Sequence, residues 1–423
     1  MDFHQIYELR CPVHGFIALN AWEREIVDSR EFQRLRRIRQ LAWTDQVYPG
    51  AMHNRFEHSL GVMHVASMLF GAVVRNSRQI LVSDLGYNEA GFERDRQLVR
   101  LAALLHDIGH SPFSHASEEL FPDRPDDKRK KFVHEEYSAA IIRGPLRDVI
   151  ESHQLNRNYG LKADNVASLI EGGSDLEAGL FWRDLVSGQM DADRMDYLLR
   201  DSHHTGVHYG KYDLHRLVST VTALRSGENR GLRLGIQEGG WHAAEALVLA
   251  RYFMFTQIYF HKTRVAYDIH IREAMKELLP GGHFPTPDEL SSYLGWDDWR
   301  VLGLLAEGKG GEHGERLSGR KHYRLAYRSP EALGPEEKRL LGEIEERLGD
   351  LVAGRVPAGR SKSWYKTDGA DISVLDEQSG TAKPLSHFSN VVRNLGKNDQ
   401  VLLYCRPEDR DEAARRVEEM LKK

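Results

Sequence analysis

The sequence contains little cysteine: of its 423 residues, only Cys11 and Cys405 are cysteines. Two cysteines give no disulfide framework, which excludes a small disulfide-stabilised secreted fold and is compatible with a reducing cytoplasm. The sequence also lacks any run of 18 apolar residues, and its first residues show no basic region followed by an apolar core. We therefore expect a soluble cytoplasmic protein without a signal peptide and without membrane contacts.

A strong net charge is also missing, because 58 Lys and Arg residues face 63 Asp and Glu residues and leave a net charge of −5. Nucleic-acid-binding proteins usually carry a basic excess or a basic stripe, so a nucleic acid is an open but not a predicted partner. One local exception is the group Arg34, Arg36, Arg37 and Arg39, for which a solvated helix face is the simpler explanation.

The length of the chain exceeds the size at which single hydrophobic cores stop growing, so we expect two lobes. Apolar residues three or four positions apart predict helices at residues 21–41, 56–76, 95–108, 134–151, 163–171, 180–200, 213–225 and 241–279. Leu279-Pro280-Gly281-Gly282 ends this pattern, and residues 320–327 and 400–404 have the character of strands. We predict a mainly α fold, with a helical domain at residues 1–279 and a smaller α+β lobe at residues 280–423.

The most informative motif is the adjacent pair His106-Asp107, which ends the apolar run of residues 98–105 and is followed by further histidines. Taken alone, such a pair is more often a hydrogen-bonded imidazole and carboxylate than a ligand set. Two other segments change that balance. His58 lies near the start of a helical apolar pattern, and residues 191–201 place several polar side chains on one helix face.

A histidine, a His-Asp pair and a distant aspartate form the ligand set of an HD-type metal site. Two imidazoles and two carboxylates suit a borderline or hard divalent ion such as Mn, Fe, Zn, Mg or Ni. The absence of thiolates argues against a purely soft site, but ligand type alone does not choose among these ions.

These segments resemble the HD-domain phosphohydrolases, and most closely the deoxynucleoside triphosphate triphosphohydrolases related to the sterile-alpha-motif and HD-domain enzyme of animals. The resemblance is close up to about residue 270 and looser beyond it. It implies a helical phosphohydrolase lobe with a smaller α+β lobe, and a homo-oligomer of two or four copies. The motifs that carry it are Pro12-Val13-His14-Gly15, residues 32–41, 48–62 and 106–115, His134-Glu135, residues 191–201, Tyr259-Phe260-His261-Lys262 and, more weakly, Leu403-Tyr404-Cys405-Arg406.

The resemblance implies one divalent ion per active site, held by His58, His106, Asp107 and Asp193. Such an ion keeps positions open for water and for a phosphate oxygen, as the hydrolysis of a phosphate ester needs. A second Mg²⁺ that arrives with the substrate triphosphate stays an open alternative.

The resemblance also implies catalytic residues near this ion. Histidine suits proton transfer because its ordinary pKa is about 6.5, although any one of these histidines alone is more often structural. The matching residues are His110, His115 and His134, with Glu118 as the acid that orients the catalytic imidazole.

The residues that match substrate contacts divide into a phosphate group and a sugar group. The phosphate group is Arg55, His115, Arg194 and Lys262, of which Lys262 equally suits a second, regulatory nucleotide. The sugar group is Gln40, Leu41, Tyr197, Asp201 and Tyr259. A tyrosine packed against the 2′ position rejects ribonucleotides by sterics, and a carboxylate accepts a hydrogen bond from the 3′-hydroxyl. Core packing is the alternative explanation for the aromatic residues.

The sequence departs from the family at the regulatory guanine site. Asp28, Gln33 and Arg36 match residues that read guanine in the animal enzyme. An acid that would hold part of that site is replaced by Cys11, and Asp28 with Arg36 could be a helix-start acid and an ion pair. We therefore predict basal activity without an added activator.

Together these residues predict metal-dependent hydrolysis of a dNTP to a deoxynucleoside and inorganic triphosphate. One alternative keeps the metal site but changes the substrate to a nucleoside monophosphate, a cyclic dinucleotide or an alarmone such as ppGpp. Another is a binding protein for nucleotides or single-stranded nucleic acid with residual catalysis, whose binding would be sensitive to salt.

Overall fold

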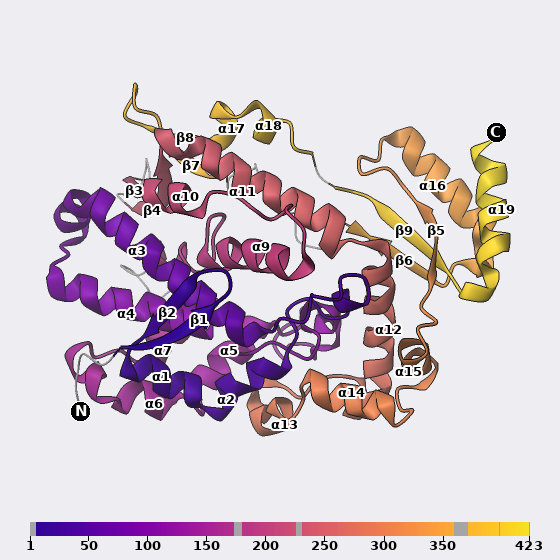
Figure 1. Cartoon of the computed structure of the whole chain (residues 1–423), viewed down its shortest axis with the longest axis horizontal. Helices are drawn as coiled ribbons and strands as arrows, with labels where there is room; N and C mark the ends of the chain where they lie inside the picture. Colours follow the sequence, from indigo (N-terminus) through magenta and orange to yellow (C-terminus); the bar gives the residue numbers. More distant parts are fainter. Residues whose placement is uncertain (1–5, 173–179, 226–230, 359–370, 397, 423) are drawn as a thin grey trace.

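The computed structural model describes residues 6–172, 180–225, 231–358, 371–396 and 398–422. Most of these residues lie in helices (Figure 1), which confirms the predicted mainly α fold. The helices up to residue 278 are α1 (Ala21–Asp28), α2 (Arg30–Gln33), α3 (Arg55–Leu85), α4 (Glu89–Leu105), α5 (His134–Arg143), α6 (Arg147–Ser152), α7 (Ala163–Glu171), α8 (Leu180–Arg183), α9 (Ala192–Thr205), α10 (Leu214–Thr220), α11 (Trp241–Met254) and α12 (Lys262–Leu278). The later helices are α13 (Leu290–Leu294), α14 (Asp298–Ala306), α15 (Gly311–Ser318), α16 (Pro335–Leu348), α17 (Leu385–Phe388), α18 (Asn390–Arg393) and α19 (Arg410–Leu421). Residues 1–5, where we expected no signal peptide, lie outside the described part.

The strands of the described residues form three small sheets. An antiparallel hairpin consists of β1 (Tyr7–Cys11) and β2 (Gly15–Leu19). A four-stranded sheet has the order β3 (Val221–Arg225), β4 (Leu232–Gln237), β7 (Ser373–Leu375) and β8 (Ala382–Pro384), in which β4 and β7 are parallel. A three-stranded antiparallel sheet has the order β5 (Arg324–Arg328), β9 (Val401–Cys405) and β6 (Gly354–Pro357).

Helix α3 is a buried helix that packs against α4 and α9. Asn54 begins it with a capping box, in which the Asn54 and Glu57 side chains each accept a hydrogen bond from the other residue's backbone N–H. Gly86 ends it in the left-handed conformation, at φ 69°. By length and composition α3 could cross a membrane, but 67% of its most apolar stretch is buried inside the protein, as expected for a core helix.

Five of the predicted helices are interrupted. The pattern at 21–41 gives α1, α2 and a 3₁₀ turn, the pattern at 134–151 gives α5 and α6, and the pattern at 180–200 gives α8 and α9. The pattern at 213–225 gives α10 only up to Thr220, and β3 follows it, because β-branched residues at 220–222 favour extended backbone and a fully buried strand shows no alternation. The pattern at 241–279 gives α11 and α12 with a π-helical turn between them at Phe255–Tyr259. Such turns shift the direction of the side chains that follow and are frequent at functional sites.

The segments before and after residue 280 pack against each other closely. One buried apolar cluster joins Trp43 and Phe113 to Tyr267 and to Tyr293 of α13. The pairing of β4 with β7 also joins a strand from each side of the predicted boundary at 279/280, and that boundary stays a prediction.

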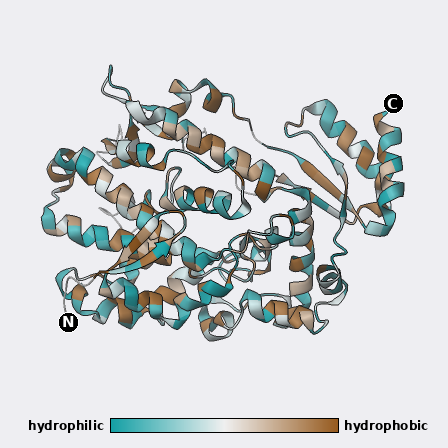
Figure 2. Ribbon diagram, viewed as in Figure 1, coloured by the Kyte–Doolittle hydropathy of each residue, from teal (hydrophilic) through white to brown (hydrophobic). Residues whose placement is uncertain are grey.

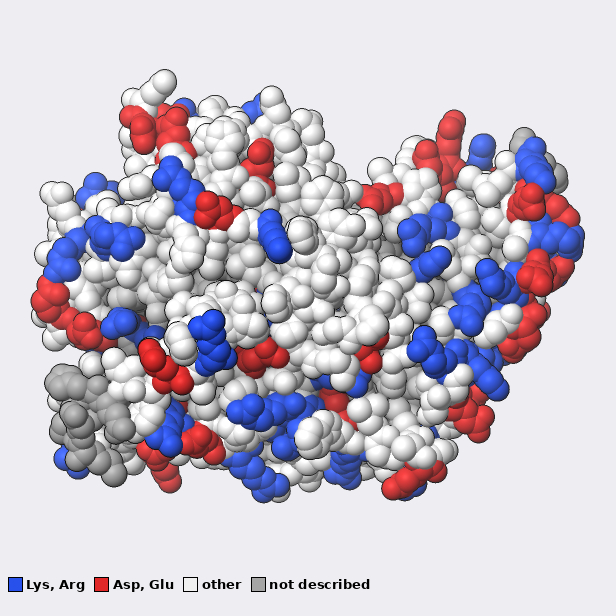
Figure 3. Space-filling view, in the orientation of Figure 1, with Lys and Arg blue, Asp and Glu red and all other residues white. Residues whose placement is uncertain are grey.

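The C-terminal part contains the sheet β5-β9-β6, against which α16 and α19 pack. All five residues of β9 are buried, and much of this strand is brown in Figure 2. On the face shown in Figure 3, blue and red side chains are interspersed over α16 and α19, and Arg347 pairs with Glu419 at 2.9 Å. This face carries mixed charge rather than a basic stripe.

Candidate metal centre and active site

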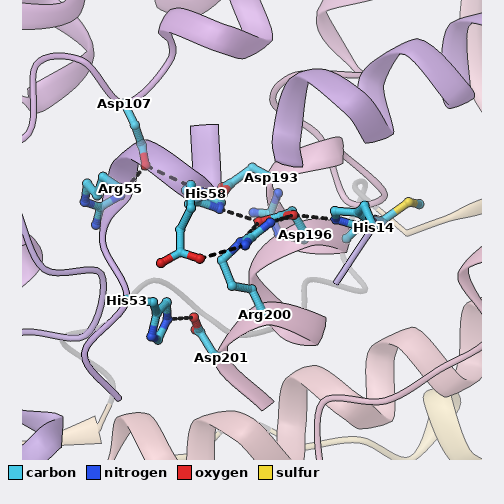
Figure 4. Close-up of polar contacts among 12 residues, drawn as sticks. His14, His53, Arg55, His58, Asp107, Asp193, Asp196, Arg200 and Asp201 are labelled. Carbon is cyan, nitrogen blue, oxygen red and sulfur yellow. Dashed lines mark hydrogen bonds and ion pairs between the residues drawn. The ribbon is translucent and has the colours of Figure 1, made fainter. Parts of the chain in front are cut away.

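The first turn of α3 presents His58 to the interior of the lobe. The side chain is fully buried, and its Nδ1–H donates to Asp196 Oδ2 at 2.8 Å (Figure 4). The other ring nitrogen, Nε2, faces Asp193 Oδ1 at 3.1 Å and Asp107 Oδ2 at 3.5 Å. A carboxylate behind the other ring nitrogen is the usual way in which proteins orient a metal-binding imidazole.

His106 lies at the end of α4, directly before Asp107. Its Nδ1–H donates to the carbonyl of Ala103 at 2.8 Å, so Nε2 is the nitrogen that is left to bind a proton or a metal ion. That Nε2 is buried without a hydrogen-bond partner among the described residues, 3.2 Å from Asp107 Oδ1 and 3.8 Å from Asp193 Oδ1. A buried lone pair without a donor is costly unless a ligand or cation meets it.

The structure brings the four predicted metal ligands together. Ligand atoms of His58, His106 and Asp107 lie within 4.8 Å of one another, and Asp193 at the start of α9 approaches both imidazoles. Two imidazoles with their Nε2 atoms directed inward and two carboxylates fit a divalent metal ion, although this donor set does not select one. We call these four residues, as a candidate site, the metal centre.

The electrostatics of the metal centre favour positive charge. Burial opposes protonation of His58, but its hydrogen bonds to Asp193 and Asp196 raise its pKa to about 10. Burial likewise opposes ionisation of Asp193, but His106 and His58 hold the pKa of that carboxyl below its ordinary value. The ionised carboxylates therefore stabilise a positive charge at the centre, and either a proton or a metal ion can supply that charge.

Arg55, the first residue of α3, lies beside the metal centre. Its guanidinium contacts Asp107, and its Nε–H donates to Ser114 Oγ at 2.7 Å. Burial opposes ionisation of Asp107, but Arg55 holds the pKa of that carboxyl well below its ordinary value. A cation in this place suits a phosphate bound at the metal centre.

A second group of titratable residues adjoins the metal centre. Glu118 Oε1 accepts hydrogen bonds from His115 Nδ1 at 2.9 Å and from His134 Nδ1 at 3.0 Å. The ring of His110 stacks on that of His134 at 3.8 Å, and His110 Nε2 lies 3.2 Å from Asp107 Oδ1. The structure thus brings the four predicted catalytic residues together, and we call them the Glu118 cluster.

The imidazoles of the Glu118 cluster differ in protonation. Burial, aided by the charge of Arg55, holds the pKa of His110 well below its ordinary value, so this ring is neutral at pH 7. Burial also opposes protonation of His134, but its hydrogen bond to Glu118 raises its pKa. Adjacent groups with pKa values pushed apart are typical of acid and base pairs.

Of the two tyrosines predicted to contact a sugar, Tyr259 binds Asp201 and Tyr197 lies beside Tyr259. The hydroxyl of Tyr259, at the end of the π-helical turn, donates to Asp201 Oδ2 at 2.7 Å, and the ring of Tyr197 lies 6.1 Å from that of Tyr259. Asp201 Oδ1 accepts from His53 Nε2 at 2.8 Å, a partner that no spacing argument singled out. Both oxygens of the predicted 3′-hydroxyl acceptor therefore already have one donor each.

Gln40 and Leu41 are both buried in the segment before α3. The Gln40 side-chain oxygen is buried and has no hydrogen-bond partner among the described residues. An acceptor of this kind suits a ligand hydroxyl.

Two predicted phosphate ligands, Arg194 and Lys262, form no hydrogen bond with the metal centre among the described residues, although Arg194 directly follows Asp193 in α9. The guanidinium of Arg194 contacts Asp191 and the carbonyl of Gly188. Lys262 is exposed and lines a pocket of about 230 Å³ with residues of the C-terminal part that include Arg324 and Arg410. A phosphate role for either residue needs its side chain to move and stays a prediction.

The three residues predicted for a guanine site do not form one group, because Gln33 contacts Arg36 and Asp28 pairs with neither of them. Gln33 donates to the Val27 carbonyl and accepts from Arg36 Nε at 2.9 Å, and Arg36 stacks on Phe56. Asp28 is exposed and pairs instead with Arg24 at 3.5 Å. The neighbouring arginine group is not a solvated helix face, because Arg34 is buried and residues 34–37 form a 3₁₀ turn.

The functional residue that sequence analysis missed is Asp196. Besides His58, its carboxylate binds His14 Nε2 at 2.6 Å and both Nε and Nη2 of Arg200 at 2.8 Å (Figure 4). A Cβ on Gly61 would lie 1.9 Å from Asp196 Oδ1, so only glycine fits there. The motifs that contain His14 and Gly61 were noted, but the partner that explains both lies far along the chain.

Comparison with protein-family models matches an HD domain at residues 55–201 and an HD associated region at residues 212–346. The chain is 36% identical over 271 residues to an uncharacterized protein of Methanocaldococcus jannaschii, a match that covers 64% of this chain and 49% of the relative. It is 32% identical over 232 residues to the mouse deoxynucleoside triphosphate triphosphohydrolase SAMHD1, covering 49% of this chain and 33% of the relative. The chain thus spans about half the length of the archaeal relative and about a third of the length of the mouse relative.

Two crystal structures resemble the whole chain. A hypothetical protein from Aquifex aeolicus superposes with a TM-score of 0.78 at 28% identity and covers 98% of this chain and 100% of its own. A phosphohydrolase from Bacteroides thetaiotaomicron VPI-5482 superposes with a TM-score of 0.69 at 25% identity and covers 95% of this chain and 100% of its own.

Proposed function

We propose that this chain, in which residues 55–201 match an HD domain and residues 212–346 an HD associated region, is a metal-dependent phosphohydrolase that cleaves dNTPs to a deoxynucleoside and inorganic triphosphate. The observation that carries this proposal is the convergence of His58, His106, Asp107 and Asp193 beside the Glu118 cluster. The likeness to the mouse triphosphohydrolase supports the choice of a dNTP as substrate. We place this activity in the cytoplasm. We also propose that the protein is a homo-oligomer, either a dimer or a tetramer.

The metal centre would hold one divalent ion, for which Mn, Fe, Mg, Zn and Ni are the candidates, and a second Mg²⁺ could arrive with the triphosphate. When bound, such an ion supplies Lewis acidity to a phosphate oxygen and lowers the pKa of water. Asp196 and the Ala103 carbonyl hold the two imidazoles in the tautomers that this role needs.

The Glu118 cluster would move the protons of the reaction. Water loses a proton to a base of the cluster and forms a new bond to the α-phosphorus, the bond from that phosphorus to the 5′ oxygen breaks, and the departing oxygen takes up a proton. The imidazoles that share Glu118 are placed to supply this proton, because their Nδ1 atoms are held by its carboxylate. The neutral His110 and the cation of Arg55 would contact the phosphate between them.

The sugar would lie between Gln40-Leu41 and the group of Tyr197, Asp201 and Tyr259. Two tyrosine rings 6.1 Å apart give the site a steric means of rejecting a 2′-hydroxyl. Arg194 and Lys262 would turn toward the phosphates when substrate binds. Arg251 of α11, which is buried near Tyr197, is a further cation on this side of the site.

The proposal is tested by pairing metal analysis of the purified protein with chromatography of the products from each dNTP and NTP. We expect a stoichiometric transition metal or Mg²⁺, and release of deoxynucleoside with triphosphate from dNTPs only. The His106→Ala, Asp107→Ala double variant is the control for contaminating phosphatases. Release of orthophosphate with a dNDP left behind would contradict the proposal, and turnover of a cyclic dinucleotide or an alarmone alone would change the substrate class.

A further inference from the structure

The two segments that carry proposed catalytic and sugar contacts have strained backbones. Phe113 and Ser114, between His110 and His115, have φ values of 57° and 53°, and Ala42, just after Leu41, has a φ of 48°. Residues other than glycine rarely adopt such left-handed conformations and keep them only where the surroundings impose them. The question is therefore which contacts hold these two segments.

One buried carboxylate, that of Asp298, bridges both segments. Asp298 lies in the first turn of α14, within the HD associated region, and is 1% exposed. Its Oδ1 accepts the backbone N–H of Phe113 at 2.8 Å, and its Oδ2 accepts the backbone N–H of Arg39 at 2.9 Å. The first bond fixes the loop 107–117, and the second fixes the residue directly before Gln40. We call these two hydrogen bonds the Asp298 bridge.

The capping of α14 does not require Asp298. Its neighbour Asp297 already caps the helix, because Asp297 Oδ1 accepts the backbone N–H of Arg300 at 2.9 Å and its Oδ2 pairs with Arg37 at 2.5 Å. Burial raises the pKa of Asp298 to about 7, while the N–H groups of Arg39 and Phe113 act against this rise. A buried carboxylate is costly to the fold, which favours a role beyond simple helix formation.

Further contacts from the same segment act on the same loop. The hydroxyl of Tyr293 donates to the Gly109 carbonyl at 2.6 Å. Arg34 donates to the carbonyls of both His110, at 2.9 Å, and Trp296. Residues 293–298 therefore hold the backbone of the loop 107–117 directly at residues 109 and 113, and Arg34 links the carbonyl of residue 110 to that of Trp296.

We propose that Asp298 is a positioning residue, which fixes the loop of His110 and His115 relative to the Gln40-Leu41 segment. It thereby sets the distance between the residues proposed to act on the phosphate and those proposed to bind the sugar. It touches neither the metal centre nor the proposed substrate contacts, and it acts through the backbone. The catalytic consequence rests on the proposed function, whereas the structural consequence does not.

The test compares Asp298→Ala and Asp298→Asn with the wild type. Asp297→Asn is the matched control for kcat and for exchange in the loop 107–117, because it weakens the cap of the same helix and touches neither amide of the bridge. It is no control for the 37–42 peptide, because Asp297 also pairs with Arg37. Hydrogen–deuterium exchange is followed in peptides that cover residues 37–42 and 107–117. Metal content, kcat and KM are measured for the dNTP that the wild type cleaves best.

We expect Asp298→Ala to speed exchange in both peptides and to lower kcat by about tenfold to a hundredfold, with a smaller change in KM and unchanged metal content. Asp298→Asn keeps one acceptor and should be intermediate on both measures. Asp297→Asn should lower Tm without changing exchange in the loop or kcat. If Asp298→Ala does not fold, the Asn variant carries the comparison.

Unchanged exchange in either peptide, or a kcat equal to that of the Asp297→Asn control, would overturn the proposal. A wild-type protein that cleaves no dNTP would refute the proposed function instead. Exchange alone would then decide whether the Asp298 bridge holds the two segments.

Discussion

The metal centre and the Glu118 cluster adjoin each other, but the fold holds them in different ways. The ligands of the metal centre come from α3, from the end of α4 and from α9, and each imidazole has a fixed partner behind its Nδ1. The Glu118 cluster lies mostly on 3₁₀ turns and loops, and one carboxylate oxygen serves two imidazoles. His58 is fully buried, whereas the His115 side chain is 63% exposed.

This difference fits two chemical tasks. A metal site needs donors held in one geometry, so that they do not rearrange when the ion binds. Proton transfer needs groups that gain and lose a proton and exchange it with water. Rigid helices suit the first task, and a partly exposed cluster suits the second.

Removing a metal ligand should separate the two regions most sharply. For Asp107→Ala we expect loss of bound metal and a fall in turnover of about a thousandfold, because several kcal/mol of charge stabilisation disappear. Metal analysis and product chromatography measure the two effects, and Tm shows whether the variant is folded. Full turnover by a metal-free folded variant would contradict the assignment of the centre.

Changing the shared acid should affect proton transfer alone. Glu118→Gln should lower kcat about a hundredfold with metal content unchanged. Burial opposes protonation of His134 and the bond to Glu118 raises its pKa, so the variant's His134 should have a lower pKa. In the profile of kcat against pH, the alkaline limb, on which activity is lost as pH rises, should therefore move to lower pH.

The matched control for that variant is Glu119→Gln, at the exposed neighbour that pairs with Arg272 at 3.2 Å. It should leave both kcat and the pH profile unchanged. An unshifted alkaline limb in Glu118→Gln would show that another group supplies the proton.

Weakening the support behind His58 should have a smaller effect. Asp196→Asn is nearly isosteric but no longer accepts two full hydrogen bonds from charged partners, so metal affinity should fall by about 10- to 100-fold. Turnover should recover at saturating metal. Titration of the metal-depleted protein measures this, and unchanged affinity would mean that His58 is oriented by packing alone.

The smallest effect is expected at the residues matched to a guanine site. We expect turnover without GTP or a dNTP activator, and Arg36→Ala should change turnover by less than about twofold, because exposed pairs contribute little. Steady-state rates with and without GTP check both statements. An obligatory activator would place a working regulatory site at Gln33 and Arg36.

The sequence made the metal centre predictable because its ligands lie in short motifs of unusual composition. His106-Asp107 is a local signal, and the mainly α fold follows from apolar periodicity that the structure confirms. The change from α10 to β3 at Val221 was missed, because periodicity alone does not separate a short buried strand from a helix; the β-branched residues at 220–222 are the signal that indicates the strand.

The supporting residues were missed because their partners are distant in the chain. His14 and Asp196 are 182 positions apart, and Asp298 is 185 positions from Phe113. No spacing rule relates such residues. An aspartate followed by another aspartate, as at 297–298, looks like an ordinary helix start, and only the fold shows that the second one faces inward.

The parallel pairing of β4 with β7 has a consequence for shortening this protein. Deleting the chain beyond α18 would spare that pairing, whereas deleting it from α16 onward would leave the backbone N–H and C=O groups of β4 open along one side. An uncovered strand edge is a template for association between copies. A fragment limited to the helical segment should therefore aggregate, even though it would contain every residue of the metal centre.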